Sequence, residues 1–355
     1  MGPSIMTAPM PSLPSGFAAR PVNPATDVPV ILELCETAAL ADYGVLDTTE
    51  QMVRGAYSLP SFDVETDSLL VVDAAGRAAA VAEYYDGEEL HVAPYLFLRV
   101  RPENRDDEVL PELLRWVAER AAQNVSLAPD GARVGLHTDL SPTNRQTASA
   151  LAAAGWHHDR SALTMEIDLA EAAPLPEPAW PDGISVRAAT LPQDARAVHA
   201  AENDFFSDHY GFTPNPFEQW WHFRTEFFKA EPELWILALD GDDITGMALC
   251  SSSRPGQPDL GWISTLGVRR DWRRRGLALA ILHHSFRLLE ARGKRRAGLG
   301  VDAESLTGAT RLYEKAGMHV VREAHDYELV VREGRDLRTV SLAPEGAAAV
   351  TEPRP

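Results

Sequence analysis

The sequence predicts a two-domain α/β protein. Its 355 residues suffice for two domains of ordinary size. Strand-like and helix-like stretches alternate in both halves, and prolines at 174, 176, 178 and 181 indicate a stiff linker between them. The predicted organisation is a disordered tail at 1–15, an N-terminal domain at 16–169, a linker at 170–183, a C-terminal domain at 184–332 and a tail at 333–355.

Composition and charge narrow the class of protein. The apolar fraction of 45% is ordinary for a globular chain, and the net charge of −19 opposes binding to nucleic-acid phosphates. The negative charge is compatible with a cationic acceptor such as an amine, and equally with solubility alone. Cys35 and Cys250 lie far apart, so we expect no disulfide framework and a cytoplasmic location. We expect no signal peptide, no membrane partner, and a monomer or homodimer.

Hydrophobic periodicity predicts the elements of the first half. Apolar residues at helical spacing favour helices, and β-type runs bounded by Gly-containing turns favour strands. The residue Gly155 stops the last of these helices. The expected elements are helices at 31–40, 108–122 and 146–154, and strands at 68–72, 78–84, 90–100, 133–138 and 156–167.

The second half repeats this order. The turn at 240–243 indicates a hairpin, and Gly293 is the expected C-cap of the longest helix. The expected elements are helices at 192–206, 217–228, 277–292 and 308–315, and strands at 184–187, 234–239, 244–251, 261–268, 296–301 and 319–331.

A basic turn at 268–278 joins the strand at 261–268 to the longest helix. It reads Val-Arg-Arg-Asp-Trp-Arg-Arg-Arg-Gly-Leu-Ala, with four arginines in the six residues before Gly276. The first N–H groups of a helix lack intrahelical partners, and the helix dipole adds positive charge there. Gly276 allows phosphate oxygens to approach the backbone without a Cβ in the way. The sequence therefore predicts an anion site.

The pattern V-x-x-x-x-R-x-x-G-x-A in this turn resembles the acetyl-CoA pyrophosphate loop of the GNAT N-acetyltransferases. The resemblance implies that each half is a mixed, mostly antiparallel sheet flanked by helices. It also implies acetyl-CoA as co-substrate, with the pantetheine arm along the strand end and a backbone N–H there as oxyanion donor. The cofactor-binding residues that it implies are Leu266, Gly267, Val268, Arg273, Arg274, Arg275, Gly276, Leu277, Ala278 and Ser305.

The N-terminal half contains a degenerate copy of this turn. Arg105 retains one basic residue, but Glu108 replaces the glycine, and Asp106 and Asp107 add negative charge where phosphates would lie. We therefore expect the N-terminal copy to have lost the cofactor. Two such copies resemble tandem GNAT proteins of the mycothiol-synthase type, in which the C-terminal copy is catalytic.

The segment Arg311–Met318 resembles the family's L-Y-x-x-x-G-F element, whose tyrosine protonates the departing CoA thiolate. This assigns Tyr313 as general acid, which the pKa values of phenols (about 10) and thiols (about 8.5) allow. The N-terminal copy has Leu151 at the matching position. Ser305 stands where many family members have Asn, and Met318 replaces the usual Phe.

The general base has several candidates, because the strand at 261–268 contains no carboxylate or histidine. An alkylammonium acceptor has a pKa of about 10.4 and must lose a proton before attack. Glu202 or His209 could act directly or through water, and Asp302 is a third candidate.

The segment around these candidates is aromatic, which is typical of core but also of an apolar or cation-binding wall. No histidine group has the companions that a metal site needs, so we expect no metal. The expected activity is direct transfer of an acetyl group to a primary amine of a small molecule. A protein N-terminus or lysine as acceptor, or a non-catalytic CoA-binding protein, remain alternatives. The expected acceptor-binding residues are Phe205, Tyr210, Phe212 and Trp220.

Overall fold

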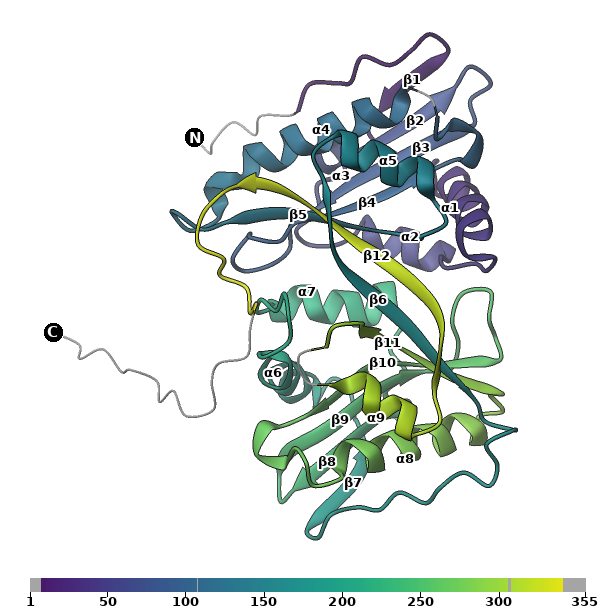
Figure 1. Ribbon diagram of the computed structural model, residues 1–355, viewed down its shortest axis with the longest axis vertical. Helices are drawn as coiled ribbons and strands as arrows, with labels where there is room; N and C mark the ends of the chain where they lie inside the picture. The colour runs from purple at the N-terminus through teal and green to yellow at the C-terminus, as the bar shows by residue number, and fades with distance from the viewer. Residues whose placement is uncertain (1–7, 107, 306–307, 341–355) are drawn as a thin grey trace, which may run out of the picture.

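The computed structural model describes residues 8–106, 108–305 and 308–340, and its strands form one twelve-stranded sheet with helices on both faces (Figure 1). The first half of the chain contributes β1 (Phe17–Arg20), α1 (Val28–Tyr43), α2 (Glu50–Ala56), α3 (Val64–Asp67), β2 (Ser68–Asp73), β3 (Ala78–Tyr85), β4 (Tyr95–Val100), α4 (Val109–Asn124), β5 (Val134–Leu140), α5 (Arg145–Ala153) and β6 (His157–Asp168).

The second half repeats this series after the proline-rich linker. It contributes β7 (Ile184–Ala188), α6 (Ala195–Phe206), α7 (Phe217–His222), β8 (Trp235–Asp240), β9 (Asp243–Ser251), β10 (Leu260–Val268), α8 (Leu277–Ala291), β11 (Arg296–Asp302), α9 (Ala309–Lys315) and β12 (His319–Arg332). The fold class expected from the sequence, a mixed and mostly antiparallel sheet flanked by helices, is confirmed.

Some elements differ from the predicted ones for local reasons. The strand expected at 90–100 begins only at Tyr95, since His91 has a positive φ of 52° and Pro94 follows. The helix expected at 217–228 ends at His222 and continues as a π-helical segment, Phe223–Phe227. The sequence does not predict β1, α2 and α3, because these elements are short and weakly periodic.

Each half buries both faces of its part of the sheet. In the first half α1 and α2 cover one face, while α4 and α5 cover the other. In the second half α6 and α7 match the first pair, and α8 and α9 match the second. Successive side chains of a strand point to opposite faces of the sheet, and β8 illustrates this alternation. Its Trp235 and Leu237 pack in one core cluster, whereas Ile236 and Ala238 pack in the other.

The two halves exchange their last strands. The strand β6 pairs antiparallel with β11 of the second half, with Asp168 opposite Arg296 and Ala162 opposite Asp302. The strand β12 lies between β5 and β6, so the sheet order is β1-β2-β3-β4-β5-β12-β6-β11-β10-β9-β8-β7. Figure 1 shows these two long strands crossing from one half to the other. The sheet is therefore continuous across the predicted boundary between 16–169 and 184–332.

The described parts of the two tails and of the linker also pack on the sheet. Ala8 is buried in the first-half core, and Leu175 of the linker is buried against the second. Beyond β12, Arg338 is 8% exposed and pairs with Glu328 and Asp336. No helix in the described ranges combines the length and apolarity needed to cross a bilayer.

The strand exchange predicts that the halves stay together when the linker is cut. We would insert a protease site after Pro176, where the chain is exposed, and cleave the folded protein. The ladders β6–β11 and β12–β5 remain, because neither passes through the linker. Size-exclusion chromatography should show the nicked protein eluting with the uncut one. Separation into two folded halves in native buffer would contradict the importance of the exchange.

Candidate functional site

A cleft opens in the second half where β10 and β11 diverge. These strands pair in parallel only from Leu260–Ile263 and Arg296–Leu299, and beyond this stretch they separate. The resulting pocket has an empty volume of about 700 Å³. Its lining comes from the loop after α6, from both strands and from α9: Phe206, His209, Tyr210, Ile263, Ser264, Thr265, Leu266, Leu299, Gly300, Val301, Asp302, Ser305, Ala309 and Tyr313.

A β-bulge shapes the β10 wall of this cleft. The pairing of β10 with β9 shifts between Ile263 and Thr265, so Ser264 has no direct partner in the ladder. Ser264 Oγ donates to Leu249 O at 2.9 Å and accepts from Arg224 at 3.2 Å. A bulge interrupts the ladder and re-aims the backbone locally, which can turn main-chain donors toward the cleft.

The basic turn lies at the end of β10 and leads into α8. Arg274 and Gly276 both adopt positive φ, at 62° and 86°. The first intrahelical hydrogen bond runs from Ala280 N to Gly276 O at 3.0 Å. The amides of Gly276, Leu277 and Ala278 therefore precede the helical hydrogen-bond ladder, and they form a concave set of donors suited to an anion.

The side chain of Arg273 holds this turn in place. Its Nε donates to Val268 O at 3.1 Å, one Nη donates to Phe205 O at 2.8 Å, and both Nη atoms bind Asp208. Burial opposes ionisation of Asp208, but the hydrogen bonds from Arg273 outweigh it and lower the pKa of that carboxyl. Arg273, which the sequence places among the cofactor contacts, directs its donors to the protein. The guanidinium of Arg273 thus holds the turn, whereas Arg274 and Arg275 are exposed and the amides at 276–278 precede the helical ladder.

The other arginines of the turn differ in position. The Arg275 guanidinium lies over the Trp272 ring at 4.8 Å, which leaves its edge toward solvent. The Ser305 Oγ accepts from Ala309 N at 3.4 Å and lies in the cleft lining, at the start of α9. Leu266 faces the cleft, whereas Gly267 and Val268 are buried beneath it.

Tyr313 comes from α9 and closes one side of the cleft. It is 7% exposed and packs in the second-half core. Burial raises the pKa of its phenol to about 12, so the group stays protonated at neutral pH. The matching residue of the first half, Leu151, is fully buried and carries no proton donor.

The two principal base candidates lie in different environments. Glu202 accepts from Trp220 Nε1 at 2.8 Å and from Arg224 at 2.6 Å, and Thr265 lies 3.3 Å away. It does not line the cleft. Its carboxylate anchors Arg224 to β10, and this occupation leaves it poorly suited to accept a substrate proton.

His209 does line the cleft, together with Tyr313. Burial lowers the pKa of its imidazole below the usual 6.5, although Asp208 works in the opposite direction. Its Nδ1 lies 3.4 Å from Asp208, which is long for a hydrogen bond, and its ring packs on Phe206 at 4.5 Å. The site thus contains a neutral imidazole at pH 7.

Of the four aromatic residues expected to bind the acceptor, only one lines the cleft. Tyr210 lines the cleft and donates to Asp159 at 3.2 Å. Phe205 and Trp220 are 2% and 4% exposed and pack in the core below β9 and β10, because their helical spacing directs them to the sheet. Phe212 lies in the following loop, where its carbonyl accepts from Thr339 N at 3.3 Å, and is not in the cleft lining.

Asp302, the third base candidate, lines the cleft, and sequence reasoning missed the row of acidic groups that the central strands place near it. In the central strands Asp326 lies directly opposite Asp139 on β5 and Arg160 on β6. Arg160 binds Asp302 at 2.8 Å. Burial and the neighbouring carboxylates raise the pKa of Asp326 to about 7. No linear signal could reveal this row, because its members come from strands that only the exchange between halves brings together.

The same central strands bring His157, Asp159 and Glu328 together. Their potential ligand atoms lie within 4.8 Å of one another. Glu328 already binds the guanidinium groups of Arg133 and Arg338. The residues thus form a charge network between the halves, and the expectation of no metal is left as a prediction.

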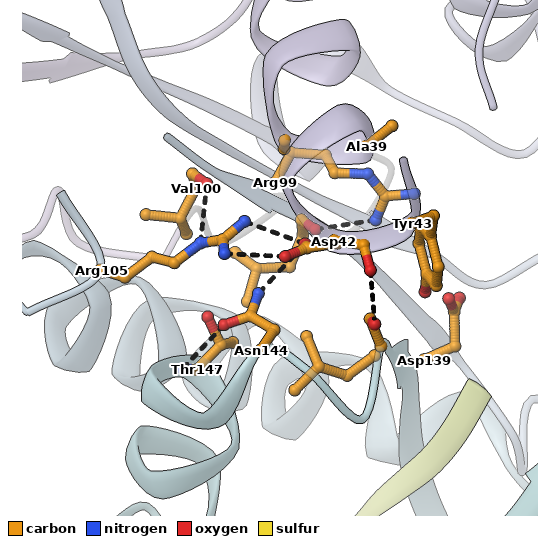
Figure 2. Close-up of a pocket in the computed structure, with 13 residues that line it drawn as sticks. Ala39, Asp42, Tyr43, Arg99, Val100, Arg105, Asp139, Asn144 and Thr147 are labelled. Atoms are coloured by element: carbon orange, nitrogen blue, oxygen red, sulfur yellow. Dashed lines mark hydrogen bonds and ion pairs between the residues drawn. The ribbon is translucent and has the colours of Figure 1, made fainter. Parts of the chain in front are cut away.

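The corresponding cleft of the first half is crossed by polar contacts (Figure 2). Arg105 repeats the clamp of Arg273, with Nε directed at Val100 O and both Nη atoms on Asp42 at 2.7 and 2.9 Å. Here, however, Asp42 also accepts from Asn144 at 3.2 Å, and its carbonyl accepts from Ser141 at 2.9 Å.

The turn after this first-half clamp also differs. Glu108, which replaces the glycine, has a φ of −66° in place of the positive φ of Gly276. The backbone therefore lacks the left-handed residue that makes the second-half turn concave. Asp107, one of the repelling charges expected from the sequence, lies outside the described residues.

Fold and cleft together define a class of protein in which two parallel strands diverge to form a cleft and the first of them leads through a basic turn into a helix. Residues 195–318 match the acetyltransferase (GNAT) family model. A GCN5-related N-acetyltransferase from Sphaerobacter thermophilus is 33% identical, with a TM-score of 0.73 over 92% of this chain and 99% of that one. The chain belongs to the GNAT family of acyl-CoA N-acyltransferases.

Two further comparisons concern a sequence relative and a structural neighbour. A mycothiol acetyltransferase of Arthrobacter sp. is 29% identical over 74% of this chain and 78% of its own. A tandem GNAT protein from the clavulanic acid biosynthesis pathway has a TM-score of 0.63 at 15% identity, over 90% of this chain and 99% of that one. The second likeness concerns the fold alone.

A pair of glycines at the two ends of α8 tests the anion-binding turn. Gly276 and Gly293 have φ values of 86° and 75°, and an added Cβ would meet no atom within 4 Å at either. Gly276→Ala and Gly293→Ala should each cost about 1 kcal/mol of unfolding free energy through backbone strain. Only Gly276→Ala should weaken CoA binding, by about tenfold or more, because its Cβ points where phosphate approaches. Calorimetry with CoA measures this, and equal affinities of the two variants would refute the assignment.

Proposed function

We propose that the second half binds acetyl-CoA and transfers its acetyl group to the primary amine of a small molecule. The observation that carries this proposal is the cleft between β10 and β11, which contains a protonated phenol and a neutral imidazole and reaches Leu266, two residues before Val268, where the basic turn begins. In the proposal the diphosphate binds the amides of residues 276–278. The pantetheine arm follows the edge of β10 at Leu266, with Ser305 beside it.

The reaction needs one base and one acid. In the proposed reaction the amine nitrogen attacks the thioester carbonyl, the C–N bond forms and the C–S bond breaks. A backbone N–H near the β10 bulge stabilises the oxyanion. His209 accepts the proton of the attacking amine, and Tyr313 donates its proton to the departing thiolate. Glu202 is assigned to structure, because Arg224 and Trp220 occupy its oxygens.

The acceptor is proposed to be a small cation. Asp302 lines the cleft, and Asp326 and Asp139 extend this negative charge along the central strands, which favours an ammonium group over an anion. Tyr210 adds an aromatic wall, since its ring lies on Arg160 at 4.1 Å and its hydroxyl reaches Asp159. The similarity to proteins named mycothiol acetyltransferase supports a small-molecule acceptor.

The coenzyme is proposed to bind in the second half only. Polar contacts of Asp42 cross the first-half cleft, its turn has Glu108 in place of glycine, and Leu151 replaces the tyrosine. We infer that the first half contributes strands and charge to the acceptor side but no second reaction centre.

Free-thiol release from acetyl-CoA over a panel of small amines tests this function. At least one amine should give turnover, and Tyr313→Phe should lower kcat by about 10²-fold or more with little change in the acetyl-CoA KM. Tyr84→Phe is the control, because Tyr84 is also buried but lies in the first half. A Tyr313→Phe enzyme as fast as the wild type would exclude the general acid. Binding without turnover on any amine would instead favour a CoA-binding protein.

The pH profile tests His209. A base with a lowered pKa stays unprotonated until the pH falls well below 6.5, so the acid limb of kcat/KM should have its midpoint below that value. His209→Gln should lower kcat and remove this limb, while Glu202→Gln should retain it. An unchanged acid limb in His209→Gln would reassign the base, and Asp326 would be the next candidate, since its pKa is raised to about 7 by burial and neighbouring carboxylates.

A further inference from the structure

A second large pocket lies in the first half, on the face of the sheet that α1 and α2 cover. It has an empty volume of about 1070 Å³, and its walls come from both helices, from β3 and β4, and from the loop after α1. Phe223 and Phe227 of the π-helical segment reach across from the second half and close one side. The lining is mostly apolar, with Met52, Val53 and Phe97 facing the space.

A carboxylate occupies the bottom of this pocket. Glu83 is 3% exposed, and its two oxygens accept from the hydroxyls of Tyr57 and Tyr85, each at 2.5 Å. The nearby guanidinium of Arg99 is already bound to Asp47 at 3.1 Å and to Leu98 O at 3.0 Å. Among the described residues Glu83 makes no ion pair within 4.0 Å. Burial raises the pKa of this carboxyl, which shows how unfavourable its isolated charge is.

The equivalent position of the second half has no charge. Glu83 lies opposite Phe97, three residues before Val100, and Leu249 lies opposite Thr265, three residues before Val268. Leu249 is fully buried in a filled core cluster with Phe205, Trp220 and Met247. At this strand position the first half thus has a carboxylate beside a hollow, whereas the second half has Leu249, and its nearby carboxylate, Glu202, is paired with Arg224. An unpaired buried carboxylate costs several kcal/mol, so packing alone does not account for it.

We propose that this pocket binds a small apolar amine, with the ammonium group on Glu83 and the hydrocarbon or aromatic body against Phe97, Met52 and Phe223. The two tyrosine hydroxyls that donate to Glu83 favour its ionised form, and with Glu83 ionised, Glu83, Asp47 and Arg99 give the lining one net negative charge, which a monocation neutralises. Phosphates and carboxylates are disfavoured by the same charge, so acyl-CoA does not fit this description. An aromatic wall adds attraction for the cation and its body.

The site is held open by close backbone contacts. A Cβ on Gly55 of α2 would lie 2.8 Å from the Cα of Phe227, so the two backbones are in direct contact there. His222 Nε2 lies 2.9 Å from Gly55 O, and Gln51 donates to Glu226 O at 3.1 Å. These contacts fix the two phenylalanines over the pocket, so the pocket exists before a ligand arrives.

Calorimetry with three matched probes tests the proposal without acetyl-CoA, and so independently of catalysis. The probes are 4-phenylbutylamine, 4-phenylbutanol and 4-phenylbutyrate, which share one skeleton and differ in charge. The amine should bind at least about tenfold more tightly than the alcohol, and the acid should bind most weakly. The proposal would be overturned if the amine bound no more tightly than the alcohol, or if none of the three probes bound.

Variants locate the binding. Glu83→Gln should weaken the amine about tenfold and leave the alcohol unchanged, and Phe223→Ala, at a 38% exposed residue, should weaken both. Asp302→Asn, in the second-half cleft, should leave the Glu83-dependent affinity for the amine unchanged. If Glu83→Gln fails to fold, Phe223→Ala still tests the proposal. An affinity for the amine that Phe223→Ala leaves unchanged would place the binding outside this pocket. Loss of affinity in Asp302→Asn would assign the amine to the acceptor cleft and reject the pocket.

Discussion

The exchange of β6 and β12 is the constraint on which the rest of the molecule depends. It places a strand of the first half against β11, which forms one wall of the second-half cleft, and a strand of the second half against β5. The acidic row beside the cleft exists only because Asp326 and Arg160 become direct neighbours through this pairing. Each half therefore supplies structure that the other cannot provide, and the sheet cannot be divided without opening strand edges.

The two copies retain one clamp but differ in the turn behind it. In each copy an arginine binds an aspartate, Arg273 on Asp208 and Arg105 on Asp42. In each copy the Nε of the same arginine also donates to the carbonyl at the end of the preceding strand. The clamp thus serves the turn's shape in both copies and does not by itself indicate a cofactor. The residue three positions later distinguishes the two turns, because Gly276 reaches a positive φ and Glu108 does not. An arginine in the pattern is therefore weaker evidence for phosphate binding than the glycine.

The sequence predicts the features that depend on local order. Periodicity finds most strands and helices, and the turn and Tyr313 follow from contiguous patterns. Features that depend on tertiary pairing are not predictable in this way. The sequence offers Glu202 as a candidate base, yet in the structure its carboxylate oxygens accept hydrogen bonds from Arg224 and Trp220. The acidic row and the strand exchange need the register of the central sheet, which no single segment encodes.

The first half also supports the cleft of the second half through direct contacts. The bulge at Ser264 is tied to Arg224, which also binds Glu202 and Thr265. This partly buried ion pair therefore ties the π-helical segment to α6 and β10. The same segment rests its backbone on Gly55 of the first half. The geometry of the second-half cleft is thus tied to a contact with the first half, and Glu202, which the sequence offers as a base, helps to fix the segment that makes this contact.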